Sequence, residues 1–164
     1  MDKTQLREMI DTVLVYLDPI IKYSYTAREL LMLTAATESH LGTYWRQIKG
    51  PARGIFQMEP ATEQDIWVNF LAYKQPLLKL LKDLLGPANF NFPALQWNLA
   101  YQIAMARVHY FRVKKPLPLI GATGNWSHKE VMQLAEYWKD HYNTSAGKGT
   151  PKKAYDDYMR LCIS

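Results

Sequence analysis

Residues 26–39 read TARELLMLTAATES, an apolar run that ends on a carboxylate and a hydroxyl. Thr26 and Glu29 have the spacing of a capping box, in which the Thr hydroxyl and the Glu carboxylate bind free amide groups at a helix start. We therefore predict a helix that begins at Thr26 and continues as an apolar helix to Thr37. Glu38 then lies near the C-terminal end of this helix.

Helical patterns also dominate the chain on both sides of this segment. Apolar residues recur every three or four positions, and proline, glycine or capping residues separate the runs. The further helices that we predict cover residues 5–17, 62–73, 77–85, 93–110, 128–142 and 151–161. Ser127 and Glu130 form a second capping box, and Thr150 is expected to cap the last helix. The predicted fold class is all-α, in one domain over residues 1–164, with an extended segment or short β-hairpin near residues 54–58.

The composition is that of an ordinary globular protein. Hydrophobic residues make up 48% of the 164 residues and charged residues 21%, which argues against a disordered chain. A single cysteine, Cys162, excludes an intramolecular disulfide. Charged residues such as Asp2 and Arg7 interrupt the first turns, so we expect no signal peptide. The apolar runs are far shorter than the ~20 residues that span a bilayer, so we expect no membrane anchor.

The chain carries a net charge of +5, which would favour polyanionic partners such as nucleic acid, teichoic acid or the bacterial wall. Its basic residues are spread out, and the tightest groups are Lys114-Lys115 and Lys148 with Lys152-Lys153. None forms the long basic run of a nucleic-acid tail, so no nucleic-acid partner is expected. The four histidines lack the spacing of zinc ligands. We therefore expect no metal and no cofactor.

Three short motifs share a pattern with known proteins. Glu38-Ser39 is followed by Gly54-Ile55-Phe56-Gln57-Met58-Glu59-Pro60-Ala61-Thr62, and His141-Tyr142-Asn143 occurs near the C-terminus. This set resembles the soluble lytic transglycosylase and goose-type lysozyme families, whose motifs read Glu-Ser, Gly-Leu-Met-Gln with a Met-Pro-Ala-Thr tail, and Ala-Tyr-Asn. Glu59 stands before Pro60, in the position that methionine has in that tail, and His141 takes the place of alanine. The resemblance implies a lysozyme-like domain that cuts the glycan strands of peptidoglycan.

The resemblance places the catalytic acid at Glu38. Glycoside cleavage needs a proton on the leaving oxygen, and a carboxylic acid kept protonated in a partly apolar cleft supplies it. Leu33, Ala35 and Ala36 precede Glu38, and Tyr44 and Trp45 lie close in sequence, so we expect an apolar wall beside Glu38 that raises its pKa. The alternative is that Glu38 is a solvated carboxylate at a helix end, where its charge interacts unfavourably with the helix dipole.

The other motif residues are expected to bind substrate. Ser39 orients the acid or contacts the sugar, or else bonds local backbone. Gly54 lets the backbone and the sugar approach each other, and Gln57 offers a donor and an acceptor. The resemblance implies that the Tyr142 hydroxyl bonds Glu38 and that Asn143 contacts the sugar. The alternative is a Tyr142 packed in the core and an Asn143 that ends a helix.

Aromatic side chains divide into two groups by their position in the sequence. Those in or beside loops are candidates for stacking on sugar rings: Tyr44, Trp45, Phe56 and Trp126. Those at helical spacing are expected in the core: Trp97, Tyr101, Phe111 and Trp138.

Two reaction outcomes remain open. In a lytic transglycosylase, as the resemblance implies, Glu38 acts alone and the product carries a 1,6-anhydro ring. An inverting hydrolase needs a second carboxylate ~6.5 to 9.5 Å away, and Glu59, Glu63 and Asp65 are near in sequence. The transglycosylase outcome is preferred.

A different class of function also remains open. The chain could be a non-catalytic structural or wall-binding protein of a phage particle, built on the same scaffold, or a basic nucleic-acid-binding domain. For the enzyme we expect a monomer. It would be made in the bacterial cytoplasm before release by a holin, or carried in a phage virion, and would act in the periplasm or wall.

Overall fold

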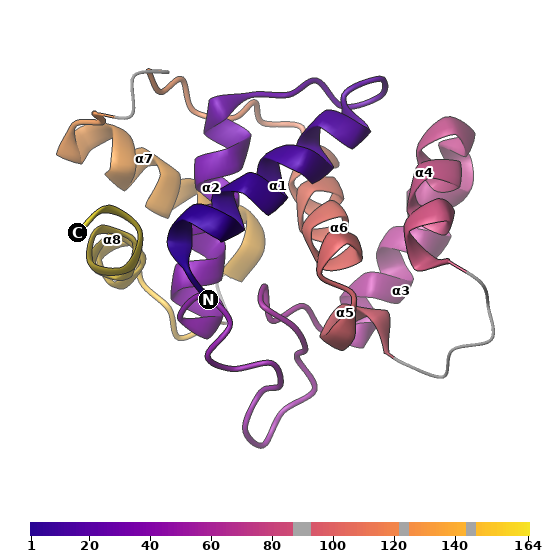
Figure 1. Cartoon of the computed structure of the whole chain (residues 1–164), viewed down its shortest axis with the longest axis horizontal. Helices are drawn as coiled ribbons and strands as arrows, with labels where there is room; N and C mark the ends of the chain where they lie inside the picture. The colour runs from indigo at the N-terminus through magenta and orange to yellow at the C-terminus, as the bar shows by residue number, and fades with distance from the viewer. Residues whose placement is uncertain (87–92, 122–124, 144–146) are drawn as a thin grey trace.

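The computed structural model describes residues 1–86, 93–121, 125–143 and 147–164, which form helices joined by loops (Figure 1). Helix accounts for 66% of the described residues, in which strand is limited to isolated bridges, so the predicted all-α fold is confirmed. The α-helices are α1 (Lys3–Leu17), α2 (Tyr25–Ser39), α3 (Pro60–Asn69), α4 (Gln75–Leu85), α5 (Ala94–Trp97), α6 (Leu99–Phe111), α7 (His128–Trp138) and α8 (Pro151–Tyr158). A 3-10 turn, η1 (Leu71–Tyr73), and two π-turns, η2 (Lys139–Asn143) and η3 (Met159–Ile163), complete the described elements.

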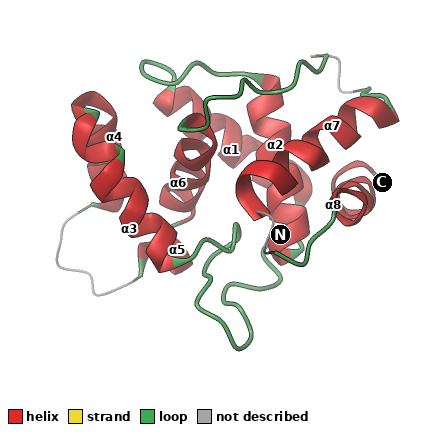
Figure 2. Cartoon of the chain, turned by 180° about the vertical axis from the view of Figure 1, so that it is seen from behind, coloured by secondary structure: helices red, strands yellow, loops and turns green. Residues whose placement is uncertain are grey.

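Helices α2 and α6 lie at the centre of the molecule (Figures 1 and 2). Helix α1 packs across both of them, α7 and α8 flank α2, and α4 and α5 flank α6 on the other side. The loop of residues 40–59 extends below the helices in both views. The central helices are apolar around most of their circumference, as helices at the centre of a protein must be.

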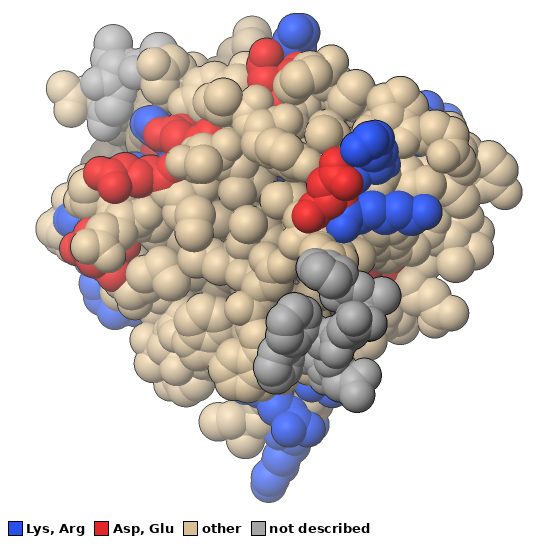
Figure 3. Space-filling model, turned by 45° about the vertical axis from the view of Figure 1, so that its right-hand side comes forward, with Lys and Arg blue, Asp and Glu red and all other residues tan. Residues whose placement is uncertain are grey.

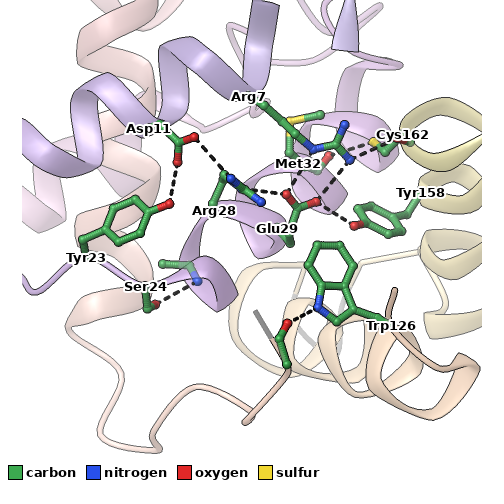
Figure 4. A network of polar contacts seen from close by, with 12 residues as sticks. Arg7, Asp11, Tyr23, Ser24, Arg28, Glu29, Met32, Trp126, Tyr158 and Cys162 are labelled. Carbon is green, nitrogen blue, oxygen red and sulfur yellow. Dashed lines mark hydrogen bonds and ion pairs between the residues drawn. The ribbon is translucent and has the colours of Figure 1, made fainter. Parts of the chain in front are cut away.

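A buried network of charges joins α1, α2 and α8 (Figure 4). The Glu29 side chain is fully buried and accepts hydrogen bonds from Arg7 at 3.1 Å, Arg28 at 2.8 Å and the Tyr158 hydroxyl at 2.6 Å. Arg28 also reaches Asp11 at 3.3 Å. Each partner satisfies part of the buried carboxylate, which would otherwise be costly to remove from water.

The start of α2 differs from the predicted capping box. Ser24 is the N-cap and accepts from the Ala27 amide at 3.1 Å, whereas Thr26 already lies in the first turn. Glu29 cannot turn back to the helix start because two arginines and Tyr158 hold its carboxylate. The other two predicted caps are confirmed, since Ser127 and Glu130 form a capping box and Thr150 accepts from the Lys153 amide.

The predicted helix over residues 93–110 is two helices. Asn98 leaves the helical conformation and caps α6, because its side chain accepts from the Tyr101 amide at 3.0 Å. The same side chain donates to the Leu84 carbonyl oxygen at 2.8 Å, which ties the break to the end of α4.

Residues 54–57 form a tight turn rather than a strand, which corrects the predicted extended segment. Arg53 and Met58 close the turn with an antiparallel bridge, and Arg53 pairs with Arg46 on its other side. Gly54 and Gln57 both have positive φ, of 76° and 45°, so the chain reverses too sharply for a hairpin strand to form. None of the described helices is both long enough and apolar enough to cross a membrane.

Candidate active site

A cleft of about 700 Å³ opens where the end of α2 meets the 54–57 turn, the start of α3 and the segment after α7. Its described lining is predominantly polar: Glu38, Gln47, Ala52, Gln57, Met58, Glu59, Thr62, His109, Tyr142, Asn143, Gly147 and Lys148. The three motifs of the sequence therefore contribute to one cavity, although they are far apart in the chain.

Glu38 is half-buried in this cleft, and its Oε1 accepts a hydrogen bond from the Trp138 indole at 3.0 Å. Burial raises the pKa of Glu38 from 4.5 to about 7, although the Trp138 hydrogen bond and the charge of Lys153 act in the opposite direction. A carboxyl group with this pKa is present in both protonation states near neutral pH. It can therefore give a proton and take one back.

The predicted apolar wall of Tyr44 and Trp45 is wrong. Neither residue lines the described cleft, since Tyr44 is 45% exposed beside His40 and Trp45 stacks on Trp97 with ring centroids 6.4 Å apart. His40 and Leu41 both adopt the left-handed conformation, so the chain turns away from Glu38 directly after α2. Trp138 and Tyr142 shield the carboxylate instead.

Ser39 is fully buried and holds the 54–57 turn against the end of α2. Its hydroxyl donates to the Ile55 carbonyl oxygen at 2.6 Å and accepts from the Gly42 amide at 2.9 Å. These hydrogen bonds to backbone groups support the alternative that Ser39 binds backbone and does not contact a sugar. Ser39 orients the turn and has no exposed surface with which to contact a substrate.

Gly54 also serves the packing of the turn. A Cβ atom at this position would lie 2.0 Å from the Leu95 carbonyl oxygen and 2.5 Å from the Gln102 side chain. The close approach is therefore between the turn and helices α5 and α6, not between the backbone and a sugar as predicted. The Gln102 side chain also accepts from the Ile55 amide at 2.8 Å, which fixes the turn on α6.

Gln57 does line the cleft, as predicted. Its side-chain amide donates to the Gly54 carbonyl oxygen at 2.8 Å, so the turn restrains its orientation. The side-chain carbonyl of a glutamine can still accept from a ligand when its amide is engaged in this way.

Tyr142 and Asn143 both line the cleft, but the predicted bond between Tyr142 and Glu38 is wrong. The Tyr142 hydroxyl donates to the Phe56 carbonyl oxygen at 2.8 Å. Burial, and next the charge of Glu38, raise the pKa of Tyr142 well above its ordinary value, so the hydroxyl stays protonated. The Asn143 side-chain oxygen accepts from Lys139 at 2.8 Å.

Of the three candidate second carboxylates, the structure brings Glu59 to the described cleft lining and leaves Glu63 and Asp65 outside it. Asp65 bonds Arg112 at 2.6 Å and Asn69 at 2.8 Å, and these hydrogen bonds lower the pKa of its carboxyl. Six residues correspond to roughly 240° of helix rotation, so Asp65 leaves α3 in a different direction from Glu59 at its N-cap. Glu63 also has another role, since it accepts from the Tyr101 hydroxyl at 2.6 Å.

Two aromatic rings at the site were not among the predicted site residues. Trp138 was predicted to be core and is buried, yet its indole also binds Glu38. His109 lines the cleft edge-on to the Tyr142 ring, with centroids 5.0 Å apart. Burial and the neighbouring Arg112 lower the pKa of His109 to about 4, so it is neutral at pH 7.

The division of aromatic residues by sequence position holds in part. Tyr101 and Trp138 are buried as predicted, whereas Trp97 is 59% exposed and Phe111 39% exposed. Phe56 is buried and reaches the site through its carbonyl oxygen. Trp126 does not line the described cleft, and its indole binds the Gly121 carbonyl oxygen.

The described residues contain no group of three or more His, Cys, Asp or Glu side chains that could hold a metal ion. Comparisons with protein-family models, with curated proteins and with solved structures find no match. The cleft and its chemistry are therefore the basis for assigning a function.

Proposed function

We propose that this protein cleaves the glycan strands of bacterial peptidoglycan at the bond between N-acetylmuramic acid and N-acetylglucosamine. Glu38 is the general acid and base. The observation that carries the proposal is the half-buried Glu38 carboxyl, with a pKa of about 7, in a cleft of about 700 Å³. A group of this kind can protonate a glycosidic oxygen near neutral pH.

Bond cleavage begins when Glu38 transfers its proton to the leaving oxygen, and the sugar ring then gains oxocarbenium character. In the transglycosylase course the ionised Glu38 next takes the proton of the muramoyl 6-hydroxyl. That oxygen closes on the anomeric carbon and gives the 1,6-anhydro product. This course needs one carboxylate that changes role, which a pKa of about 7 supports.

The remaining polar groups of the cleft suit a sugar ligand. Gln57, Asn143 and Thr62 offer hydrogen-bonding groups around the acid, and neutral His109 can donate or accept. The loop beside the cleft carries Arg46 and Lys49, both exposed, and Figure 3 shows basic side chains at the lower tip of the molecule. A basic rim favours the anionic bacterial wall.

Hydrolysis would require Glu59 as a second carboxylate, because Glu59 shares the described cleft lining with Glu38. Glu59 is exposed, whereas Glu38 is half-buried. We favour the transglycosylase because this outcome needs Glu38 alone. Mass spectrometry of digested sacculi separates anhydro products from reducing ends and decides between the two.

The test of the acid is Glu38→Gln, which keeps the shape of the side chain and removes its exchangeable proton. We expect loss of clearing of permeabilised Gram-negative cells by at least about 100-fold, the ordinary contribution of general acid catalysis. Glu59→Gln is the matched control and should retain activity in a transglycosylase. Clearing by Glu38→Gln at the wild-type rate would refute the assignment.

An assay with purified sacculi separates the enzyme from a wall-binding protein of a phage particle. Binding to purified sacculi without any release of muropeptides would identify a binder and refute the enzyme. Salt-sensitive retention on DNA without wall activity would point to the nucleic-acid class instead.

A further inference from the structure

Among the described residues, the Trp138 indole is the one group that forms a hydrogen bond with the Glu38 carboxyl. Its Nε1 lies 3.0 Å from Oε1 of Glu38, and the residue is 1% exposed. An indole N–H can donate but cannot accept. Oε1 must therefore be an acceptor whether Glu38 is ionised or protonated.

We infer that Trp138 is a positioning residue that keeps the exchangeable proton of Glu38 on Oε2. Protonation of Oε1 would replace the carbonyl-type acceptor of the indole N–H by a hydroxyl oxygen, which is a weaker acceptor, so the bond favours the proton on Oε2. The role of Trp138 in catalysis rests on the proposed function. The location of the Glu38 proton on Oε2 does not. The bond also favours the ionised carboxylate, because a hydrogen bond to a charged acceptor is stronger than one to a neutral acceptor.

The surroundings of Trp138 hold the ring in place. Trp138 is the last residue of α7, and the π-turn η2 follows it directly. The backbone of Gly149 lies against the indole, since a Cβ atom there would come within 2.4 Å of Cη2. Lys139 binds the Asn143 side chain and the Gly147 carbonyl oxygen, both at 2.8 Å, and so ties down the segment that leads to Gly149. The indole is thereby fixed before any ligand binds.

Several other titratable groups lie near Glu38, and the three aromatic ones do not change charge in the pH range in which Glu38 would be titrated. Lys153 on α8 is paired with Asp157, and the cleft also holds Glu59 and Lys148. The neighbours from α6 and η2 are His109, Tyr110 and Tyr142. Burial lowers the pKa of His109 to about 4 and raises the pKa of both tyrosines, so all three stay neutral between pH 6 and pH 9.

The experiment is a titration of the side-chain carboxyl carbons in protein labelled with ¹³C-glutamate, with Glu38→Gln to identify the resonance. In Trp138→Phe the ionised form of Glu38 loses its donor, so the carboxylate should bind a proton about tenfold more tightly than in the wild type. Trp67→Phe is the matched control. Its indole also donates to a side chain, the Tyr101 hydroxyl at 2.8 Å, at a site that does not include Glu38.

A second variant separates the hydrogen bond from the packing of the ring. Replacing Trp138 with benzothienylalanine keeps the shape of the ring system and puts sulfur in the place of N–H. It should give the same tenfold change as Trp138→Phe. Proton binding by Glu38 within twofold of the wild type in both variants would overturn the inference.

The titration does not depend on activity, so it distinguishes the inference from the proposed function. A tenfold change in a protein that releases no muropeptides would support the role of Trp138 and refute the enzyme. In an active enzyme, the pH above which cleavage falls should rise in both Trp138 variants and stay constant in Trp67→Phe.

Discussion

The Tyr142 hydroxyl donates a hydrogen bond of 2.8 Å to the Phe56 carbonyl oxygen, and this bond joins two walls of the cleft. Phe56 belongs to the turn that presents Gln57, and Tyr142 belongs to the π-turn that follows Trp138. The bond therefore sets the distance between the glutamine and the residues beside the indole.

Tyr142→Phe removes this bond and leaves the ring in place. We expect a loss of about 1 kcal/mol in the free energy of unfolding, the usual net value of such a bond, together with weaker substrate binding. Urea denaturation and the Michaelis constant for glycan cleavage measure the two effects. Tyr44→Phe is the control, because Tyr44 is exposed and lies outside the described cleft lining. Equal effects in the two variants would contradict a role for the bond.

Gly54→Ala should be far more disruptive than Gly42→Ala. Both glycines have positive φ, 76° and 83°, and each alanine would lose about 1 kcal/mol to that conformation. A Cβ atom at Gly54 would also come within 2.0 Å of the Leu95 carbonyl oxygen, whereas one at Gly42 would meet the Trp45 ring at an ordinary contact distance of 3.7 Å. The difference in unfolding free energy between the variants therefore isolates the close packing of the turn. Equal losses would show that backbone conformation alone requires Gly54.

Glu29→Gln should destabilise the protein by about 3–5 kcal/mol, the range for breaking a buried ion pair. The variant leaves Arg7 and Arg28 without the carboxylate that both of them bind. Asp83→Asn is the matched control at an exposed pair with Lys79, where the loss should stay below about 1 kcal/mol. Chemical denaturation of both variants checks this order, and a loss below that of Asp83→Asn would contradict it.

The stability of the protein should fall as the pH rises through the pKa of Glu38. Burial raises this pKa from 4.5 to about 7, so the folded state binds the proton more tightly than the unfolded state does. The resulting stabilisation is complete below pH 4.5 and is lost as the pH approaches and passes 7, by at most about 3 kcal/mol.

Urea denaturation at pH 5 and pH 8 measures this effect when the wild type is compared with Glu38→Gln. The variant cannot titrate at this position, so its stability should change less between the two pH values. An identical pH dependence in the two proteins would show that Glu38 has an ordinary pKa in the folded state.

Part of the cleft could be predicted from the sequence. Its motif residues lie at a helix end and in turns, which short sequence patterns can identify. Glu38, Gln57, Tyr142 and Asn143 all line the described cleft, as the motif pattern indicated. Trp138 was assigned to the core from its helical spacing. A buried indole still needs an acceptor for its N–H group, and this requirement could have indicated a polar partner.

The wrong predictions of helix boundaries and caps concern side chains that form hydrogen bonds with residues far away in the sequence. Asn98 interrupts a regular apolar pattern by binding the end of α4, and Trp97 beside it is exposed. Glu29 fits a capping box by spacing, but it binds arginines on two helices. Such competition depends on tertiary neighbours, which local spacing does not reveal.

Helix α2 carries two glutamates in opposite surroundings. Glu38 follows Glu29 by nine residues, about two and a half turns, so the two side chains leave the helix on opposite sides. Glu29 meets cations and is locked in place, whereas the partner of Glu38 among the described residues is a neutral indole. One face of this helix therefore ties it to its neighbours and the other presents a single carboxyl to the cleft, so substitutions around Glu29 can tune stability without touching the residues that line the cleft.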